Sequence, residues 1–309
     1  MRYLYLSENG KDVQYRNLLS DLMKEGIRVP SPQGEAAYRL PPAMLVYDLR
    51  TKTGDNDRVI LPVPDRACKG MISSAIGEII AFINGAATLE EMEKFGCNRK
   101  WWENWTSKEY IEHCGLDLRE GEMGIGSYGP TLHNLPTPEG PFNQVQNVIE
   151  QIKELPFLRT HLMTTWNPAY VFRGKGKKRK VVVAPCHGTV INFVPDIEKK
   201  EISLHHVQRS GDVPVGVAGN IIQYVALLLM AAHMTGYKPA MYYHFILDPH
   251  MYESQREPVE KYLAETTPTL FPELVLNNTA ITDIFDFRNT DFSLDGYIDR
   301  PKMSIPTPV

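Results

Sequence analysis

The sequence predicts an α+β fold, and three observations support this class. Helical and strand-like segments alternate without the regular spacing of βαβ units, so a doubly wound parallel sheet is not expected. Residues 181–209 have the pattern of a β-hairpin around the polar tip DIEKK. Residues 221–234, IIQYVALLLMAAHM, are almost continuously apolar, which is typical of a buried central helix.

The remaining elements follow in chain order. The residue pattern predicts helices at 12–26, 71–84, 88–96, 142–154 and 251–263. It predicts strands at 43–48, 59–63, 161–166, 181–194, 202–209 and 241–247. Residues 97–141 are rich in loop-forming residues. In the central helix, Asn220 precedes the first apolar residue as a candidate N-cap, and Gly236 follows the last turn.

Composition limits the class of protein. The 309 residues can bury a full core, and contents of 43% hydrophobic and 23% charged residues are typical of a soluble globular protein. The net charge of −4 gives no general attraction to nucleic acid or to an anionic membrane. The four cysteines, at positions 68, 97, 114 and 186, are scattered without the spacing of a metal site. We therefore expect no metal and no disulfide framework.

Location follows from the same features. Free cysteines suit a reducing compartment, and the charged N-terminus is unlike a signal peptide. The apolar segment 221–234 is too short to span a bilayer. These observations predict a cytoplasmic protein without a membrane partner.

One basic tract, RGKGKKRK at 173–180, has the composition of an RNA- or phosphate-binding segment. No aromatic residues are interleaved with its charges, so it offers no platform on which bases could stack. A solvated loop between two strands is the simpler interpretation, and nucleic acid is not an expected partner.

The stretch VVVAPCHGTV, residues 181–190, places Cys186 beside His187 directly after a proline. A cysteine nucleophile reacts as the thiolate and needs a positive charge or a base nearby. The predicted hairpin brings Arg209, at the end of the partner strand, back towards Cys186. An arginine there could lower the pKa of the thiol and also bind an anionic substrate. A buried structural cysteine is the alternative interpretation.

Several segments together resemble the thymidylate synthase family, which includes pyrimidine hydroxymethylases. They are GEIIAFINGAATLEEM with WWENW, GSYG, LRTHLMTTWNP, APCHGT with QRSGDVPVGVAGNIIQYVALLLMAAHM, DPHMY, and IFDFRNTDFSLDGY with the tail IPTPV. The resemblance is collinear from about residue 39 to Val309, so 1–38 would be a divergent start of one catalytic domain, 1–309. It implies a twisted mixed β-sheet flanked by helices, and a homodimer with sheets packed back to back.

The resemblance also implies a mechanism. Cys186 would add to carbon 6 of a pyrimidine ring, and carbon 5 would then attack the one-carbon unit of 5,10-methylenetetrahydrofolate. Tyr128 would help to remove the proton from carbon 5, and Glu78 would shuttle protons. The implied catalytic set is Cys186, Glu78, Tyr128, His187, Arg209, Asp212 and Asn220.

Binding roles follow from the same resemblance. The nucleoside monophosphate would be held by Arg209, Ser210 and Asn220, by His250 and Tyr252 at the sugar, and by Arg159 of the second subunit at the phosphate. The folate would lie against Trp102, Trp105, Asp212 and Gly216. Trp101 is expected to be an ordinary core residue.

Departures from the family pattern favour the hydroxymethylases, which add water rather than hydride to the exocyclic methylene. Thr160 stands where the family has a second arginine, and Ala218 and Gly219 replace a larger Pro-Phe pair, which leaves room for a water. Asn220 favours uracil, because its amide can donate to O4 and accept from N3.

The expected reaction converts dUMP, methylenetetrahydrofolate and water to 5-hydroxymethyl-dUMP and tetrahydrofolate. One alternative is a thymidylate synthase that makes dTMP and dihydrofolate. Another is a hydroxymethylase of dCMP or CMP. Outside catalysis, the alternative is a nucleotide- or RNA-binding relative that uses the basic tract.

Overall fold

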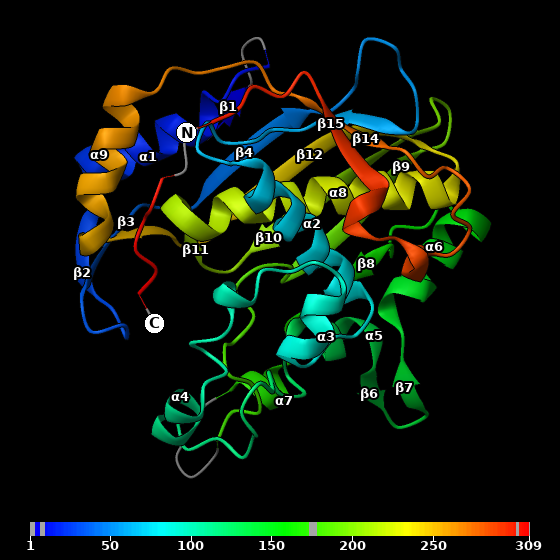
Figure 1. The fold of residues 1–309 in the computed structure, drawn as a ribbon. Coiled ribbons are helices and arrows are strands. Elements are labelled where there is room, and N and C mark those ends of the chain that lie inside the picture. The colour runs from blue at the N-terminus through cyan, green and yellow to red at the C-terminus, as the bar shows by residue number, and fades with distance from the viewer. Residues whose placement is uncertain (1–3, 7–9, 173–177, 301–302, 309) are drawn as a thin grey trace.

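A computed structural model describes residues 4–6, 10–172, 178–300 and 303–308 of the chain (Figure 1). Its centre is a six-stranded sheet in the order β1-β4-β12-β10-β9-β8. The strands are Leu4–Leu6 (β1), Ala43–Asp48 (β4), Lys238–Ile246 (β12), Glu201–Gln208 (β10), Val190–Asp196 (β9) and Leu162–Met163 (β8). Two pairs, β1 with β4 and β10 with β12, are parallel and the other three are antiparallel, so the sheet is mixed. The predicted α+β class is confirmed.

The inner face of this sheet is the core of the protein. The strand register places Met163, Ile191, His206, His244 and Leu45 in one row across it, and all five are buried. Helix α8 (Ala218–Thr235) lies along this face, and helix α2 (Lys69–Ile83) packs on α8 (Figure 1). These two helices carry several of the predicted site residues.

The outer face of the sheet has a different character. Its rows are Leu162, Asn192, His205, Tyr243 and Val46, and Val190, Val207, Phe245 and Met44. Except for Val46, these side chains stay partly or largely exposed in the single chain. A largely apolar sheet face is therefore left without a covering layer within the described residues.

Smaller elements surround the sheet. A four-stranded sheet contains Gly211–Asp212 (β11), Pro249–Tyr252 (β13), Ala36–Arg39 (β3) and Ile27–Pro30 (β2), and a three-stranded sheet contains Phe292–Asp295 (β15), Glu273–Leu276 (β14) and Arg58–Ile60 (β5). Leu135–Thr137 (β6) and Gly140–Phe142 (β7) form a hairpin. The other α-helices are Gln14–Glu25 (α1), Leu89–Lys94 (α3), Lys108–His113 (α4), Tyr128–His133 (α5), Gln144–Glu154 (α6), Pro168–Val171 (α7) and Arg256–Glu265 (α9).

Several predicted boundaries were wrong for local reasons. The strand expected at 181–194 begins only at Val190, because Pro185 lacks a donor and Gly188 takes a left-handed φ of +68°. The strand expected at 161–166 is reduced to β8. The helix expected at 251–263 begins only at Arg256, because the chain first completes β13. The loop-rich region 97–141 also contains the short helices α4 and α5.

The central helix is longer than predicted. A π-helical turn, Val213–Val217, leads directly into α8, and the N-cap residue of α8 is Val217, so the prediction of an Asn220 cap was wrong. Gly236 ends the helix with a φ of +73°, as predicted. By length and composition, Val213–Thr235 could cross a membrane, which corrects the expectation that the apolar segment is too short. However, 89% of its most apolar window is buried inside the fold, as in the core helix of a globular protein.

Candidate active site

Cys186 lies half-buried in the loop that precedes β9. The backbone nitrogen of Ser210 donates to the carbonyl of Cys186 at 3.2 Å, which ties this loop to the end of β10. Arg209 donates from Nε to the carbonyl of Pro185 at 3.4 Å, and its guanidinium lies 5.3 Å from the centre of the Trp166 ring. The hairpin therefore brings Arg209 to Cys186, as its pattern predicts.

Opposing effects act on the pKa of the Cys186 thiol. Burial raises its pKa, whereas the hydrogen bond with Tyr128 and the positive charge of Arg209 lower it. Burial is the largest of these effects, so the pKa stays above its usual value. The charge of Arg209 acts on the thiol in the expected direction, but burial outweighs it.

Tyr128 holds the cysteine in place from the start of α5. Its hydroxyl oxygen accepts a hydrogen bond of 2.8 Å from the backbone nitrogen of Cys186 and lies 3.2 Å from the sulfur. Its ring is stacked against both Phe82 and His187, with ring centres 4.6 and 4.3 Å away. Burial raises the pKa of Tyr128 well above its usual value, so the hydroxyl keeps its proton at neutral pH.

His187 belongs to the packed wall of the site. Its Nδ1 lies 2.9 Å from the hydroxyl of Tyr224, and burial lowers its pKa to about 3. The imidazole is therefore neutral at physiological pH and can exchange hydrogen bonds without carrying charge.

Glu78 lies in the middle of α2 and is only 7% exposed. The indole of Trp102 donates to its Oε1, and the side-chain amide of Gln223 donates to its Oε2. Burial raises the pKa of Glu78 to about 7, and these two hydrogen bonds moderate the rise. A carboxyl group with this pKa can both hold and release a proton near neutral pH.

Asn220 is bound on both sides by other side-chain amides. Its Nδ2 donates to Oε1 of Gln223 at 2.9 Å, and its Oδ1 accepts from Nε2 of Gln208 at 2.9 Å. The Oε1 of Gln208 in turn lies 2.8 Å from Nε2 of His244. Sequence reasoning missed both glutamines. For Gln223, the available signal was a polar residue inside an almost continuously apolar helix.

The predicted folate residues Asp212 and Gly216 lie close together. Asp212 accepts hydrogen bonds from the backbone nitrogen of Val215 at 3.2 Å and from Nε2 of Gln255 at 3.0 Å, and burial raises its pKa. A Cβ added at Gly216 would lie 3.8 Å from Oδ1 of Asn220 and 3.9 Å from Cβ of Asp212. These are ordinary van der Waals distances, so Gly216 lies close to both Asn220 and Asp212.

The predicted sugar residues lie beside Asp212. His250 is the register partner of Asp212 across the β11–β13 pair, and its ring centre lies 5.3 Å from that of Tyr252. Nδ1 of His250 lies 3.0 Å from the carbonyl of Asp248, and the hydroxyl of Ser210 donates to the Asp248 carboxylate at 3.4 Å. Two residues predicted to bind the nucleotide, Ser210 after β10 and His250 on β13, thus both contact Asp248.

Three predicted residues lie apart from this cluster or take unexpected partners. Trp102 makes its hydrogen bond to Glu78, at the wall of the site. Trp105 packs edge-on against Tyr110, with ring centres 5.2 Å apart. Arg159 is exposed just before β8, and no hydrogen bond within the described residues links it to Cys186 or Arg209. Trp101, expected to be an ordinary core residue, is only partly buried but packs against the core cluster.

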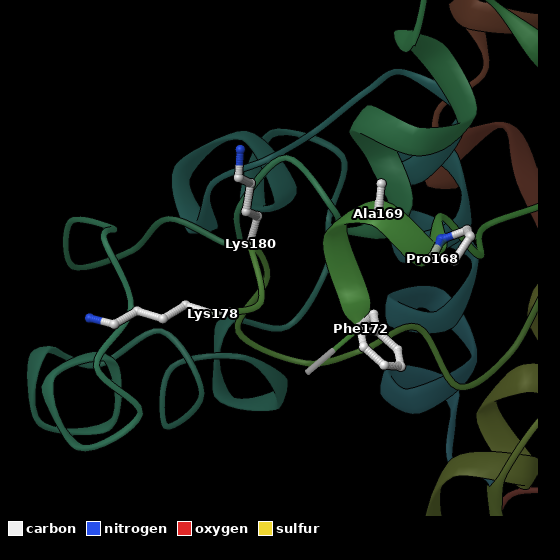
Figure 2. A pocket seen from close by; sticks show the side chains of 5 residues that line it. All are labelled: Pro168, Ala169, Phe172, Lys178 and Lys180. Atoms are coloured by element: carbon white, nitrogen blue, oxygen red, sulfur yellow. The ribbon is translucent and has the colours of Figure 1, made fainter. Parts of the chain in front are cut away.

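The basic tract is described only from Lys178, so 173–177 lie outside the described residues. It follows helix α7 rather than a strand, which corrects the predicted loop between two strands. Arg179 binds the hydroxyl of Tyr110 at 3.0 Å and the sulfur of Cys114 at 3.3 Å. A cavity of about 350 Å³ lies here, lined by Pro168, Ala169, Phe172, Lys178 and Lys180 (Figure 2). None of the predicted site residues lines it.

Within 4–6, 10–172, 178–300 and 303–308, no group of three or more His, Cys, Asp or Glu residues could hold a metal ion.

Comparison with known proteins identifies a family and a curated relative. The family model described as thymidylate synthase matches residues 13–309, and so begins earlier than the resemblance found from about residue 39. Human thymidylate synthase is 27% identical over 304 residues, which cover 95% of this chain and 90% of the human protein. Both matches extend over the segments that carry Glu78, Cys186 and Asn220.

Proposed function

The chain belongs to the thymidylate synthase family of one-carbon transferases, and we propose that within this family it is a dUMP hydroxymethylase. The family uses methylenetetrahydrofolate as its one-carbon donor and transfers the unit to carbon 5 of a dUMP-type nucleotide. In the proposed reaction, dUMP, methylenetetrahydrofolate and water give 5-hydroxymethyl-dUMP and tetrahydrofolate.

The contacts of the site support the proposed roles. Cys186 would bond to carbon 6 of the ring, while Arg209 beside it holds the phosphate and favours the thiolate. Carbon 5 neighbours carbon 6, so the Tyr128 hydroxyl, 3.2 Å from the sulfur, would also lie near the proton that must leave carbon 5. Glu78, with a pKa of about 7, would supply and accept protons near the ring oxygen.

The observation that carries the choice of water over hydride lies next to Asn220. A Cβ added at Gly219 would meet no atom within 4 Å outside its own helix backbone. Space therefore exists at Gly219, the residue next to Asn220 in the chain, whereas a synthase must exclude water until the hydride is transferred. Room for one water at this wall supports hydroxymethylation.

The test is identification of both products by mass spectrometry. The enzyme is incubated with methylenetetrahydrofolate and, separately, with dUMP or dCMP. We expect 5-hydroxymethyl-dUMP with tetrahydrofolate and no dihydrofolate. Equal amounts of dTMP and dihydrofolate would identify a thymidylate synthase instead, and 5-hydroxymethyl-dCMP would identify a cytosine enzyme. Absence of any product would favour the non-catalytic nucleotide- or RNA-binding relative.

We also propose that the protein is a cytoplasmic homodimer without a membrane partner. The outer face of the six-stranded sheet carries apolar side chains such as Met44, Val207, Tyr243 and Phe245, which a single chain leaves partly exposed. Packing two such faces against each other would remove them from water. The same packing would carry the exposed Arg159 of one subunit towards the other.

A further inference from the structure

We propose that Gln223 is a positioning residue that fixes which way the amide of Asn220 points, and thereby decides which pyrimidine base the enzyme accepts. This inference rests on the proposed function in one respect, because it takes Asn220 as the side chain that meets the base. It adds a specificity role for a residue that neither the sequence pattern nor the family comparison singles out.

The argument starts from a row of five hydrogen-bonded side chains. In order, they are Glu78, Gln223, Asn220, Gln208 and His244, and they link helices α2 and α8 to strands β10 and β12. Each of these side chains is almost completely buried, with Gln223 and Gln208 only 1% exposed. Bulk water cannot replace a lost partner at such positions, so every donor needs an acceptor within the row.

The two ends of the row fix its direction. When Glu78 is ionised, its carboxylate can only accept hydrogen bonds, so Gln223 then turns its Nε2 to Glu78. Its Oε1 is then left to accept from Nδ2 of Asn220 at 2.9 Å.

The other end gives the same answer independently. The backbone carbonyl of Ser210 can only accept, and Nε2 of Gln208 donates to it at 3.0 Å. The same Nε2 donates to Oδ1 of Asn220 at 2.9 Å. Both neighbours therefore require one orientation of the Asn220 amide, and the opposite orientation would set donor against donor and acceptor against acceptor.

A fixed amide reads only one base. After these two contacts, Asn220 has one N–H and one lone pair left for a ligand. Uracil presents an acceptor at position 4 and a donor at N3, whereas cytosine presents the reverse. If Cys186 and Arg209 hold the ring in place, only one base can match an amide that cannot rotate, whereas a free amide could turn over and match either.

The helix places Gln223 correctly for this role. Residues 220 and 223 are three positions apart on α8, so their side chains lie on the same face of the helix. Helix α2 crosses this face and brings Glu78 to the far side of Gln223 (Figure 1). Removal of Gln223 would leave Asn220 held from one side only.

The experiment compares Gln223→Met with a matched control, Gln14→Met. Methionine has a similar length but cannot form the two strong hydrogen bonds. Gln14 is also 1% exposed and makes two hydrogen bonds, with the backbone of Val46, far along the chain from Asn220. Dissociation constants of dUMP and dCMP are measured by calorimetry. We expect the preference for dUMP over dCMP to fall by about tenfold or more in Gln223→Met and to stay unchanged in Gln14→Met.

The ratio of the two dissociation constants is the informative quantity, because general damage to the site weakens the binding of both nucleotides by the same factor. An unchanged ratio in Gln223→Met would overturn the inference. If that variant does not fold, the ratio is measured in Gln223→Ala instead, because alanine favours a helix. A water molecule in the space left by the shorter side chain can either donate a hydrogen bond to Asn220 or accept one from it. If the wild type preferred dCMP, the proposed substrate would be wrong. The positioning role of Gln223 would still be tested by whether the ratio of the two dissociation constants changes in the variant.

Discussion

The hydroxyl of Tyr128 accepts a hydrogen bond from the backbone nitrogen of Cys186 at 2.8 Å and lies 3.2 Å from the sulfur of the same residue. These two residues are 58 positions apart, and their contact joins α5 to the loop before β9. The tyrosine thereby fixes both the backbone and the thiol of the proposed nucleophile.

Cys186→Ala should abolish product formation and leave the affinity for dUMP within about tenfold of the wild type, because the thiol forms a bond rather than a binding contact. Turnover and calorimetric binding are measured side by side. Cys114→Ala is the control, because Cys114 contacts Arg179 and not the site. Appreciable turnover by Cys186→Ala would remove this residue from the mechanism.

Tyr128→Phe should lower kcat by about a hundredfold while KM for dUMP changes little. The phenyl ring keeps the stacking on Phe82 and His187, and only the hydroxyl beside Cys186 is lost. Steady-state kinetics test this. If kcat stayed at the wild-type value, the hydroxyl would have no part in the rate-limiting chemistry.

Glu78 should make the stability of the protein depend on pH. Its pKa is about 7 in the folded protein against a usual 4.5, so between these pH values the folded state holds a proton that the unfolded state has released. The contribution of Glu78 to the free energy of unfolding is fully present below about pH 4.5. It falls by about 3 kcal/mol in total as the pH rises towards 7.

Urea unfolding of wild type and Glu78→Gln at several pH values isolates this effect. Asp12, whose pKa burial also raises to about 7, contributes to both proteins and cancels in the difference. Relative to Glu78→Gln, the wild type should lose unfolding free energy as the pH rises from 4.5 to 7. A difference that does not change with pH would mean that Glu78 is ionised throughout.

Gly219→Phe should change the fate of the one-carbon unit. The aromatic ring would occupy the free space beside Asn220, where we place the attacking water. We expect the yield of 5-hydroxymethyl-dUMP to fall about tenfold or more, as measured by mass spectrometry, with dUMP still bound. Gly70→Phe is the control, because Gly70 also has free space but lies at the exposed start of α2. Unchanged hydroxymethylation would place the water elsewhere.

Phe245→Glu should separate the proposed dimer. A charge at this position of the outer sheet face would have to be buried without a partner between two sheets. In sedimentation at micromolar concentration, the wild type should have twice the 35.1 kDa mass of one chain, and Phe245→Glu should be a monomer. Leu270→Glu, which changes a 60% exposed leucine outside this sheet, should remain a dimer. A fully active wild-type monomer would refute the dimer.

The sequence alone determined the elements whose signals are local. The apolar run of α8, its glycine stop at Gly236 and the antiparallel pairing of β9 with β10 follow from patterns within a few residues of each other. The proximity of Arg209 to Cys186 was predictable for the same reason, because a hairpin fixes which residues face each other.

Only the tertiary structure decided where the polar groups of the site find their partners. Gln223 lies 145 positions from Glu78, and Asn220, which has the sequence features of a helix cap, instead lies inside a continuous helix between two glutamines. The pKa of Cys186 likewise depends on how far the fold excludes water, which here outweighs the charge of Arg209. Hydrogen bonds and burial join residues that the backbone brings together from distant segments, so no local pattern in the chain contains them.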